Sequence, residues 1–312
     1  MKINILLPTT RPSGPYDWGT NLANMLNQRQ ISAYCTYEPS KLLASLFSQN
    51  ADIIHTTVPL TYKLWKKPVV MTIHGEYTRE KNIWRFFYPL AIGKAQIVTV
   101  PSRFLKERLN LKEAVVIPNA VIPESFSQVQ HSEKKVINLV TVTSFYFSDK
   151  AEGVLHILEA ISAAQKEIAA KIQYTVVGGG PFLEKVKGTA TSYNINVKFT
   201  DRITNVKEVL ADSDIFLYNS LHDNFPMAIL EAMACGLPVI INNVGAVSEI
   251  IENGKDGYIC GNEKDYCERL LNLVNDYKLR GFVGNNARNT VENKFNWASV
   301  VNNYIDVYNK VR

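Results

Sequence analysis

The residue types best suited to chemistry in this chain are two carboxylates, Asp223 and Glu231, which stand eight positions apart. A strand-like apolar run ends at Asn219 just before them, and Pro226 favours a helix that begins nearby. The first turn of a helix has free N–H groups and the positive end of the helix dipole, which together can hold a diphosphate. Carboxylates suit sugar hydroxyls because each accepts several hydrogen bonds. The spacing therefore predicts that the two side chains contact different parts of one elongated ligand.

The elements that must position these residues are short apolar runs that alternate with amphipathic stretches along nearly the whole chain. Strand-like runs include Ile3–Leu7 and Val69–Ile73, and helix-like stretches include Gly153–Lys166 and Asn224–Ala234. This alternation predicts parallel sheets with helices on both faces, which is the doubly wound α/β class. Proteins of that class bind ligands past the carboxyl ends of strands, where Asp223 is expected to lie.

The length of 312 residues favours two domains of about 150 residues each. The polar stretch 123–135 lacks periodicity and is interpreted as the boundary. We therefore expect one Rossmann-like domain over residues 1–125 and a second over residues 135–296. The last segment, Trp297–Arg312, has the pattern of an amphipathic helix that could cross back onto the first domain.

Composition indicates a soluble globular protein, since 46% of the residues are hydrophobic and 20% are charged. No apolar run approaches the roughly 18 residues of a membrane span, and residues 1–8 lack the features of a signal peptide. The four cysteines form no C-x-x-C pair, and no histidine stands at ligand spacing beside them. We therefore expect neither disulfides nor structural zinc, and we expect a cytoplasmic location.

The charge is unevenly divided along the chain. Residues 1–130 carry 15 Lys and Arg against 8 Asp and Glu, a net charge of +7, while the remainder has a net charge of −2. A basic half suggests an anionic partner, such as phospholipid headgroups or a phosphorylated acceptor, although ordinary surface charge is the alternative. No nucleic-acid-binding motif is present, so no nucleic-acid partner is expected.

The stretch around the two carboxylates resembles the GT-B glycosyltransferases of family 4, which retain the anomeric configuration of the transferred sugar. Their hallmark is two Glu residues with seven residues between them, followed by A-M-A-x-G-x-P-V-I. This chain has Asp223, the pair Phe225-Pro226 and then Glu231-Ala-Met-Ala-Cys-Gly-Leu-Pro-Val-Ile240. The resemblance implies a GT-B fold that carries a nucleotide-sugar donor on the second half and an acceptor on the first.

The same resemblance implies roles for individual residues. Asp223 would contact hydroxyls of the donor sugar, and Glu231 would contact the ribose of the nucleotide. Because the first family Glu is Asp here, one methylene shorter, the identity of the donor sugar is less predictable. The implied donor-binding residues on this segment are Asn224, Phe225, Met227, Ala228 and Glu231.

Lys150 lies in Ser144–Gly153, which looks like the family's strand–loop–helix segment where an Arg and a Lys neutralise the leaving diphosphate. The Lys matches, but Ser144 or Phe145 stands where the Arg is expected. A helix N-terminus, Arg202 or a metal ion could compensate for the missing cation.

Two positions in the first half match the family more loosely. Gly14 follows the first strand and aligns with the second Gly of the family's glycine-rich loop, where backbone N–H groups approach phosphate. His74-Gly75 follows the run Val69–Ile73 and resembles a pair whose His contacts the donor sugar and the reaction centre. A purely structural His74 is the alternative.

Two other motifs are weaker than they look. The glycine-rich stretch Gly178–Glu184 has Leu183 where a dinucleotide-binding loop needs glycine, which disfavours NAD. Asp212-Ser-Asp214 resembles a metal-binding D-x-D, but we interpret it as the end of a helix and the start of a strand. We therefore expect no essential metal and no cofactor besides the nucleotide-sugar co-substrate, with UDP- or GDP-sugars favoured.

Aromatic and basic residues interleave in Trp65–Lys67 and in Tyr77–Tyr88. Such segments suit the inner face of a membrane, where rings bury and cations meet anionic headgroups. A core helix with an ordinary charged face is the alternative. The expected acceptor is accordingly a saccharide, a lipid-linked or a small molecule. The rival functions are a nucleotide-sugar epimerase and a catalytically inactive sugar-nucleotide-binding scaffold.

Overall fold

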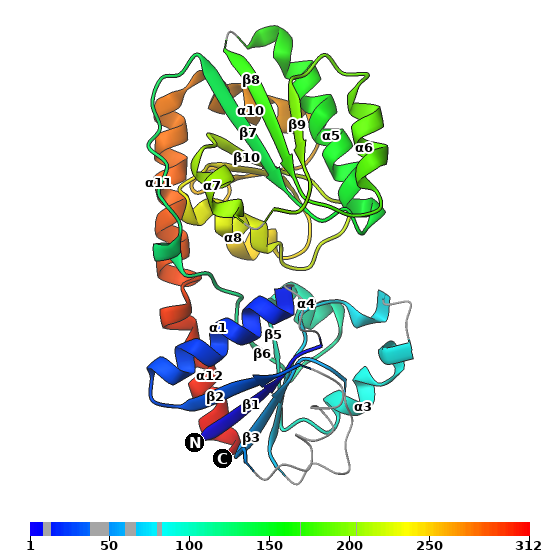
Figure 1. The fold of residues 1–312 in the computed structure, drawn as a ribbon, viewed down its shortest axis with the longest axis vertical. Helices are drawn as coiled ribbons and strands as arrows, with labels where there is room; N and C mark the ends of the chain where they lie inside the picture. Colours follow the sequence, from blue (N-terminus) through cyan, green and yellow to red (C-terminus); the bar gives the residue numbers. More distant parts are fainter. Residues whose placement is uncertain (9–13, 38–49, 60–66, 80–82, 169, 204) are drawn as a thin grey trace. The chain divides into compact units, whose positions relative to one another are not determined.

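The computed structural model describes residues 1–8, 14–37, 50–59, 67–79, 83–168, 170–203 and 205–312. These residues form two compact units, each built around its own sheet (Figure 1). The first unit comprises residues 1–120 together with 295–312, and the second comprises residues 121–294.

The first unit has a six-stranded parallel sheet in the order β2-β1-β3-β4-β5-β6. Its strands are β1 (Lys2–Leu6), β2 (Ser32–Thr36), β3 (Ile53–Thr56), β4 (Val69–Thr72), β5 (Ile97–Val100) and β6 (Val115–Val116). Its helices are α1 (Gly14–Gln28), α3 (Tyr88–Ile92), α4 (Arg103–Arg108) and α12 (Trp297–Val311), with short 3₁₀ turns η1 (Tyr77–Arg79) and η2 (Ile83–Phe86).

Helix α12 belongs to the first unit because its apolar face is buried there. Val300, Tyr304 and Tyr308 recur at intervals of four, as one face of a helix requires, and all three are buried. The helix packs against α1 and β4. Trp18 on α1 donates a hydrogen bond to the Tyr304 hydroxyl at 3.1 Å, so the chain's last helix closes the core of its first unit.

The second unit has a six-stranded parallel sheet in the order β12-β11-β10-β7-β8-β9. Its strands are β7 (Val136–Val142), β8 (Lys171–Val177), β9 (Val197–Thr200), β10 (Ile215–Tyr218), β11 (Val239–Asn242) and β12 (Tyr258–Cys260). Its helices and turns are η3 (Pro123–Ser125), α5 (Ser148–Ala164), η4 (Gln165–Glu167), α6 (Leu183–Ala190), α7 (Val206–Ala211), α8 (Met227–Ala234), α9 (Val247–Ile250), α10 (Glu263–Asn275) and α11 (Tyr277–Lys294). The strand order reverses between β7 and β10, and doubly wound folds bind ligands at such a point.

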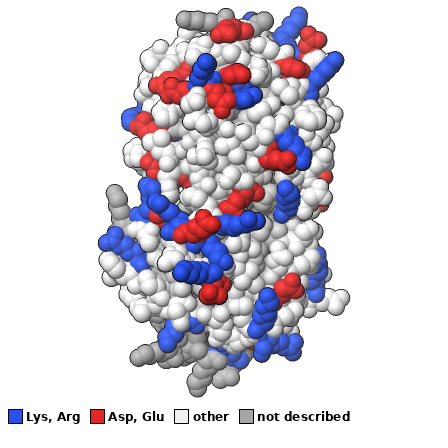
Figure 2. All heavy atoms as spheres, turned by 180° about the vertical axis from the view of Figure 1, so that it is seen from behind, with Lys and Arg blue, Asp and Glu red and all other residues white. Residues whose placement is uncertain are grey.

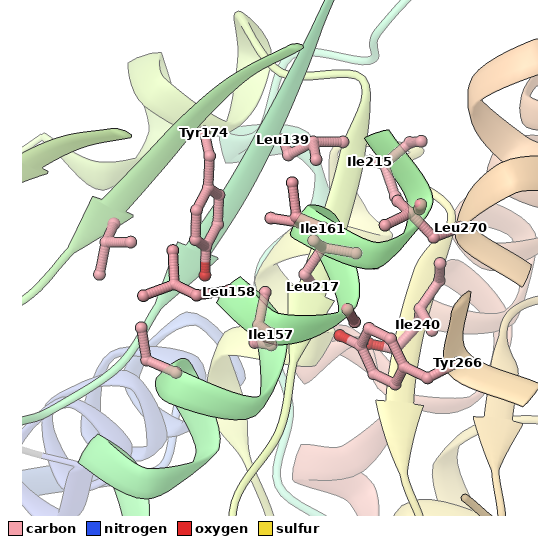
Figure 3. Close-up of a cluster of buried hydrophobic side chains, with 14 of the residues drawn as sticks. Leu139, Ile157, Leu158, Ile161, Tyr174, Ile215, Leu217, Ile240, Tyr266 and Leu270 are labelled. Carbon is pink, nitrogen blue, oxygen red and sulfur yellow. The ribbon is translucent and has the colours of Figure 1, made fainter. Parts of the chain in front are cut away.

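Helices cover both faces of this second sheet. On one face, Ile157 and Ile161 of α5 and Leu270 of α10 pack with Leu139 and Leu217 of the strands (Figure 3). Helix α8 packs against β10 and β11, and α11 packs against α8. Two parallel sheets flanked by helices confirm the predicted doubly wound α/β class.

The polar stretch interpreted as a boundary is held against the second unit. Phe126 and Val129 are buried, and the Val129 N–H donates to the Cys235 carbonyl at 2.8 Å. His131 contacts the Gly236 carbonyl through Nε2 at 2.8 Å. The chain therefore passes between the units near residue 120, ahead of this stretch.

Two smaller predictions agree with the structure. Asp212 ends α7, and Asp214 is fully buried, where it accepts hydrogen bonds from the Asn138 N–H at 2.9 Å and Lys134 Nζ at 2.6 Å. These aspartates therefore belong to a helix end and a strand start. All four cysteines are free thiols, as expected. Within the described part of the chain, no helix is both long and apolar enough to span a bilayer.

Candidate functional site

The switch point of the second sheet brings together the two predicted residues of opposite charge. Lys150 lies in the first turn of α5, which follows β7, and Asp223 lies between β10 and α8. Because β7 and β10 are neighbouring parallel strands, their carboxyl ends meet at one edge of the sheet. The Lys150 ammonium donates to Oδ2 of Asp223, forming a salt bridge.

Tyr218, the last residue of β10, completes this cluster. Its hydroxyl donates to Asp223 Oδ2 at 2.5 Å and accepts a hydrogen bond from Lys150 Nζ. The other carboxylate oxygen, Oδ1, accepts the N–H of Asn224 at 2.7 Å. Only 17% of the Lys150 side chain and 13% of the Asp223 side chain are exposed, so the charges are largely covered yet mutually compensated.

Burial raises the pKa of Tyr218 well above its ordinary value, and the negative charge and hydrogen bond of Asp223 raise it further. The hydroxyl therefore keeps its proton and acts as a neutral donor. Tyr218 was not predicted from the sequence. The available signal was a tyrosine, with its polar hydroxyl, at the end of the apolar run Ile215–Tyr218. A tyrosine in that position is equally typical of a buried core residue.

Two glycines let the surrounding loops approach this closely. A Cβ at Gly153 in α5 would lie 1.9 Å from the Asn219 carbonyl oxygen. Gly245 has a φ of +59°, and a Cβ there would lie 2.4 Å from the Asp223 carbonyl oxygen. Any side chain at either position would push α5 or the loop before α9 away from the segment that carries Asp223.

The start of α8 has no cap from its own N-cap residue. Pro226 occupies the N-cap position and makes no side-chain hydrogen bond to the first turn. Met227 and Ala228, in this first turn, are partly exposed. The buried Oδ1 atom of Asn224 has no hydrogen-bond partner among the described residues. Such an end, with its positive dipole, suits an anionic group.

Glu231 lies one turn further along α8. It stands four residues after Met227, so both side chains lie on the same face of the helix, and both are partly exposed. Phe225 is buried and holds the loop before α8 in place. The structure thus gathers the predicted residues of the segment 223–231, together with Lys150, around one helix start.

Arg202 is exposed and lies in the loop after β9, beside Gly179. Strand β9 is the edge strand, separated from β10 by β7 and β8. Lys150 follows β7, so two strand spacings, roughly 10 Å across the sheet, lie between the strands that lead to Arg202 and to Lys150. Its predicted compensation for the missing Arg stays a prediction.

The two predicted residues of the first unit lie at the ends of β-strands or helices of that unit. Gly14 is the first residue of α1, and a Cβ built there would meet no atom of the described residues within 4 Å, so these residues do not require glycine there. His74 follows β4, and its ring packs edge-on against Trp18 with 4.7 Å between centroids. Burial lowers the pKa of His74 to about 4, so the ring is neutral near pH 7. Its buried Nε2 atom has no partner among the described residues.

One group of described side chains could hold a metal ion. His156 and Glu159 of α5 and Glu263 of α10 place one potential ligand atom each within 4.8 Å of one another. Both glutamates are exposed, and the group borders a cavity of about 200 Å³ that is lined by His156, Glu263 and Asn219. The group does not include Lys150 or Asp223. The absence of an essential metal stays a prediction.

The fold and the site define a doubly wound α/β protein with a candidate phosphate- and sugar-binding site at the switch point of its second sheet. The chain belongs to the family described as glycosyl transferases group 1, whose sequence profile matches residues 121–290. The profile described as Glycosyltransferase Family 4 matches residues 16–125. The resemblance noted in the sequence is therefore confirmed, and the protein is a glycosyltransferase.

Relatives with established names support this assignment. The chain is 26% identical to N-acetyl-alpha-D-glucosaminyl L-malate synthase of Bacillus anthracis, over 91% of this chain and 82% of the relative. It is also 26% identical to UDP-Gal:alpha-D-GlcNAc-diphosphoundecaprenol alpha-1,3-galactosyltransferase of Escherichia coli, over 86% of this chain and 79% of that protein.

Solved structures show the same fold. The crystal structure of Anabaena HepE in complex with UDP and glucose has a TM-score of 0.81 at 16% identity, covering 99% of this chain and all of the other. Sucrose-phosphate synthase from Thermosynechococcus elongatus also has a TM-score of 0.81 at 16% identity, covering 99% of each chain. The predicted GT-B fold is confirmed.

Proposed function

We propose that this glycosyltransferase moves a hexose from a nucleoside-diphosphate sugar, UDP- or GDP-linked, to a saccharide, lipid-linked or small-molecule acceptor with retention of the anomeric configuration. The observation that carries the proposal is the pairing of Lys150 with Asp223 beside the start of α8, which its N-cap residue leaves uncapped, at the switch point of the sheet. Cation, carboxylate and helix N-terminus match the phosphate and hydroxyl groups of such a donor.

In this proposal, the N–H groups of Met227 and Ala228 bind the diphosphate, and Lys150 stabilises the charge that builds on it as the glycosidic bond breaks. Asp223 accepts a hydrogen bond from a sugar hydroxyl, and Glu231 accepts from the ribose. The roles of Gly14 and of His74, whose ring is neutral near pH 7, stay predictions. The names of two relatives fit: one structure was solved with UDP and glucose, and one enzyme is named for a UDP-Gal donor.

The bond changes need no protein nucleophile. The bond from the anomeric carbon to the phosphate oxygen breaks while the acceptor oxygen bonds to the same face of that carbon. The acceptor's proton passes to the leaving phosphate oxygen. Positioning and charge stabilisation then supply the rate enhancement, without a metal or a further cofactor.

Binding tests the donor site directly. Thermal shifts are measured with UDP, GDP, ADP and their sugar conjugates, and Glu231→Ala is compared with Glu208→Ala, which removes an exposed carboxylate from α7. A ligand at 100 times its dissociation constant should raise the free energy of unfolding by about 2.7 kcal/mol. The shift should survive in Glu208→Ala and disappear in Glu231→Ala. No shift with any nucleotide would contradict the proposal.

Turnover distinguishes the rivals. A transferase releases nucleoside diphosphate faster when acceptor is present, and NMR of the product reports whether the anomer is retained. An epimerase converts the donor to a second nucleotide sugar without acceptor. An inactive scaffold binds the nucleotide and turns over nothing.

We further propose a cytoplasmic enzyme with a peripheral membrane contact through its basic first unit. Of the segment 77–88, Tyr77 is buried and stacks on Tyr88, so these rings serve the core, as the alternative interpretation expects. Ile83, Trp84 and Phe86 of this segment, and Leu90 just after it, are instead 65%, 46%, 63% and 60% exposed. Arg79 and Arg85 are exposed beside them, while Trp65, Lys66 and Lys81 lie outside the described residues. Exposed rings with neighbouring cations suit an anionic lipid surface.

A further inference from the structure

We infer that Tyr218 is a positioning residue of the donor site: its hydroxyl holds the Asp223 carboxylate in place when Lys150 leaves that carboxylate for the donor's diphosphate. The inference rests on the proposed function and adds a residue that neither the motif nor the family resemblance points to.

In the structure, the Asp223 carboxylate is fully engaged by the protein itself. Oδ2 accepts hydrogen bonds from both Tyr218 and Lys150, and Oδ1 accepts the Asn224 N–H at 2.7 Å. Lys150 in turn is bound to Asp223 and Tyr218. A donor must therefore compete with bonds that already exist, and its diphosphate carries more negative charge than one carboxylate.

Lys150 is the member of this cluster that can move. Its ammonium sits at the end of a flexible four-carbon stem, and only its tip is tied to the cluster. When Lys150 turns to the diphosphate, the Asp223 Oδ2 atom loses one of its two donors and becomes able to accept a hydroxyl of the sugar.

Tyr218 is the member that cannot move. It is 2% exposed, and it pairs with Ile241 of β11 in the interior of the sheet. Its ring lies parallel to Phe216 with 6.4 Å between centroids, and its carbonyl accepts from the Tyr266 hydroxyl at 3.4 Å. The raised pKa of Tyr218 keeps the hydroxyl protonated at every working pH. The hydroxyl is thus a fixed donor aimed at Asp223 Oδ2.

The two hydrogen-bond donors of Asp223 therefore have different roles when the nucleotide sugar binds. Lys150 serves the phosphate, while Tyr218 keeps the carboxylate oriented for the sugar. Without the hydroxyl, the adjacent Asn224 N–H would be the one donor from the described residues left to the Asp223 carboxylate once Lys150 has moved, and the carboxylate could rotate. The loss should therefore appear in sugar transfer and not in binding of the nucleoside diphosphate.

Tyr218→Phe removes the hydroxyl and keeps the ring. The matched control is Tyr174→Phe, because Tyr174 is also a buried tyrosine of the second sheet and its hydroxyl bonds Thr141 at 2.7 Å. The kcat of sugar transfer to water is measured as UDP release from UDP-glucose, or GDP release from GDP-mannose, together with the KM of the donor. The dissociation constant of UDP or GDP is measured by calorimetry.

The kcat of Tyr218→Phe should fall roughly 10- to 100-fold, the range for losing a hydrogen bond to a charged group, while nucleoside-diphosphate affinity changes less than about threefold. In an Asp223→Asn background, the same change should lower kcat less than about threefold, because the two residues act as one unit. Tyr174→Phe should keep the wild-type kcat.

Three outcomes overturn the inference alone: wild-type kcat in Tyr218→Phe, an undiminished loss in the Asp223→Asn background, or an equal loss in Tyr174→Phe. A wild-type protein that neither binds nor turns over any donor overturns the proposed function as well, which keeps the two failures apart.

Discussion

At the scale of single residues, the site has one described cation in contact with the carboxylate that we assign to the donor sugar. Lys150→Met keeps the length of the side chain and removes its charge. Because charge develops on the leaving diphosphate, kcat/KM should fall roughly 10²- to 10³-fold in a steady-state transfer assay.

The matched control for that variant is Lys185→Met. Lys185 is 57% exposed and pairs with Glu152 at 2.7 Å, so it also loses a salt bridge, but on the surface of α6. Its kcat/KM should stay within about twofold of wild type, because exposed pairs contribute little. Equal losses in the two variants would mean that Lys150 acts only through folding.

His55 gives a pH prediction for the first unit. It is fully buried between the Tyr308 hydroxyl, 2.6 Å from Nδ1, and the Thr72 hydroxyl, 2.7 Å from Nε2. Burial, and secondarily the nearby His74, lower the pKa of His55 from 6.5 to about 3. Between pH 6.5 and 3, His55 is therefore protonated in the unfolded chain but not in the folded state. The free energy of unfolding falls as the pH drops through this range.

All four tryptophans belong to the first unit, so their fluorescence reports its unfolding in urea. Below pH 6, His55→Gln should reduce the pH slope of the free energy of unfolding by up to about 1.4 kcal/mol per pH unit. The variant should be less stable than wild type at pH 7.5, where it loses buried hydrogen bonds. An unchanged slope would show that His55 is protonated in the folded state too.

At the scale of elements, the site depends on the close approach of α5 to the end of β10. Gly153→Ala should lower the free energy of unfolding of the second unit by about 1–3 kcal/mol, because its Cβ would collide with the Asn219 carbonyl oxygen. It should also weaken donor turnover, since the same helix carries Lys150.

The Cβ of Gly188→Ala in α6 meets no atom of the described part of the chain within 4 Å, so this variant should stabilise the protein by up to about 1 kcal/mol. Circular dichroism in urea measures both; a loss in Gly188→Ala similar to that in Gly153→Ala would contradict the packing argument.

The elements also show what the sequence could and could not predict. Asp223, Glu231 and Lys150 were accessible because each lies within a local motif beside a recognisable strand. Tyr218 was not, because its role depends on β10 lying next to β7, a pairing of strands that are more than 70 residues apart. The stretch 123–135 looked like a linker by composition, but its few apolar residues, such as Phe126 and Val129, are enough to anchor it. The role of Tyr218 and the packing of the stretch 123–135 both depend on contacts between residues far apart in the sequence.

At the scale of the whole molecule, the chain passes from the first unit to the second near residue 120 and returns near residue 295. The charge follows the same division. On the face drawn in Figure 2, both signs of charge lie close together over the second unit, while Lys and Arg predominate over the first. The exposed apolar residues of η2 and α3, including Trp84 and Phe86, belong to that basic unit. Because positive charge and exposed apolar residues both lie on the first unit, we expect the protein to bind an anionic membrane through that unit.

Replacing Arg79 and Arg85 by Gln tests this orientation. Each cation near an anionic surface contributes about 1 kcal/mol, so the double variant should bind vesicles with about one-third phosphatidylglycerol roughly 30-fold more weakly in a sedimentation assay. In the matched control, Gln replaces Lys171 and Lys198, which are two exposed cations of the second unit. This control variant should bind the vesicles as tightly as the wild-type protein. Binding of wild type should also weaken as salt shortens the Debye length. If both double variants lose affinity equally, the net charge of the protein and not its first unit accounts for the attraction. If the wild-type protein does not bind anionic vesicles, the proposed membrane contact is wrong and a soluble acceptor is favoured.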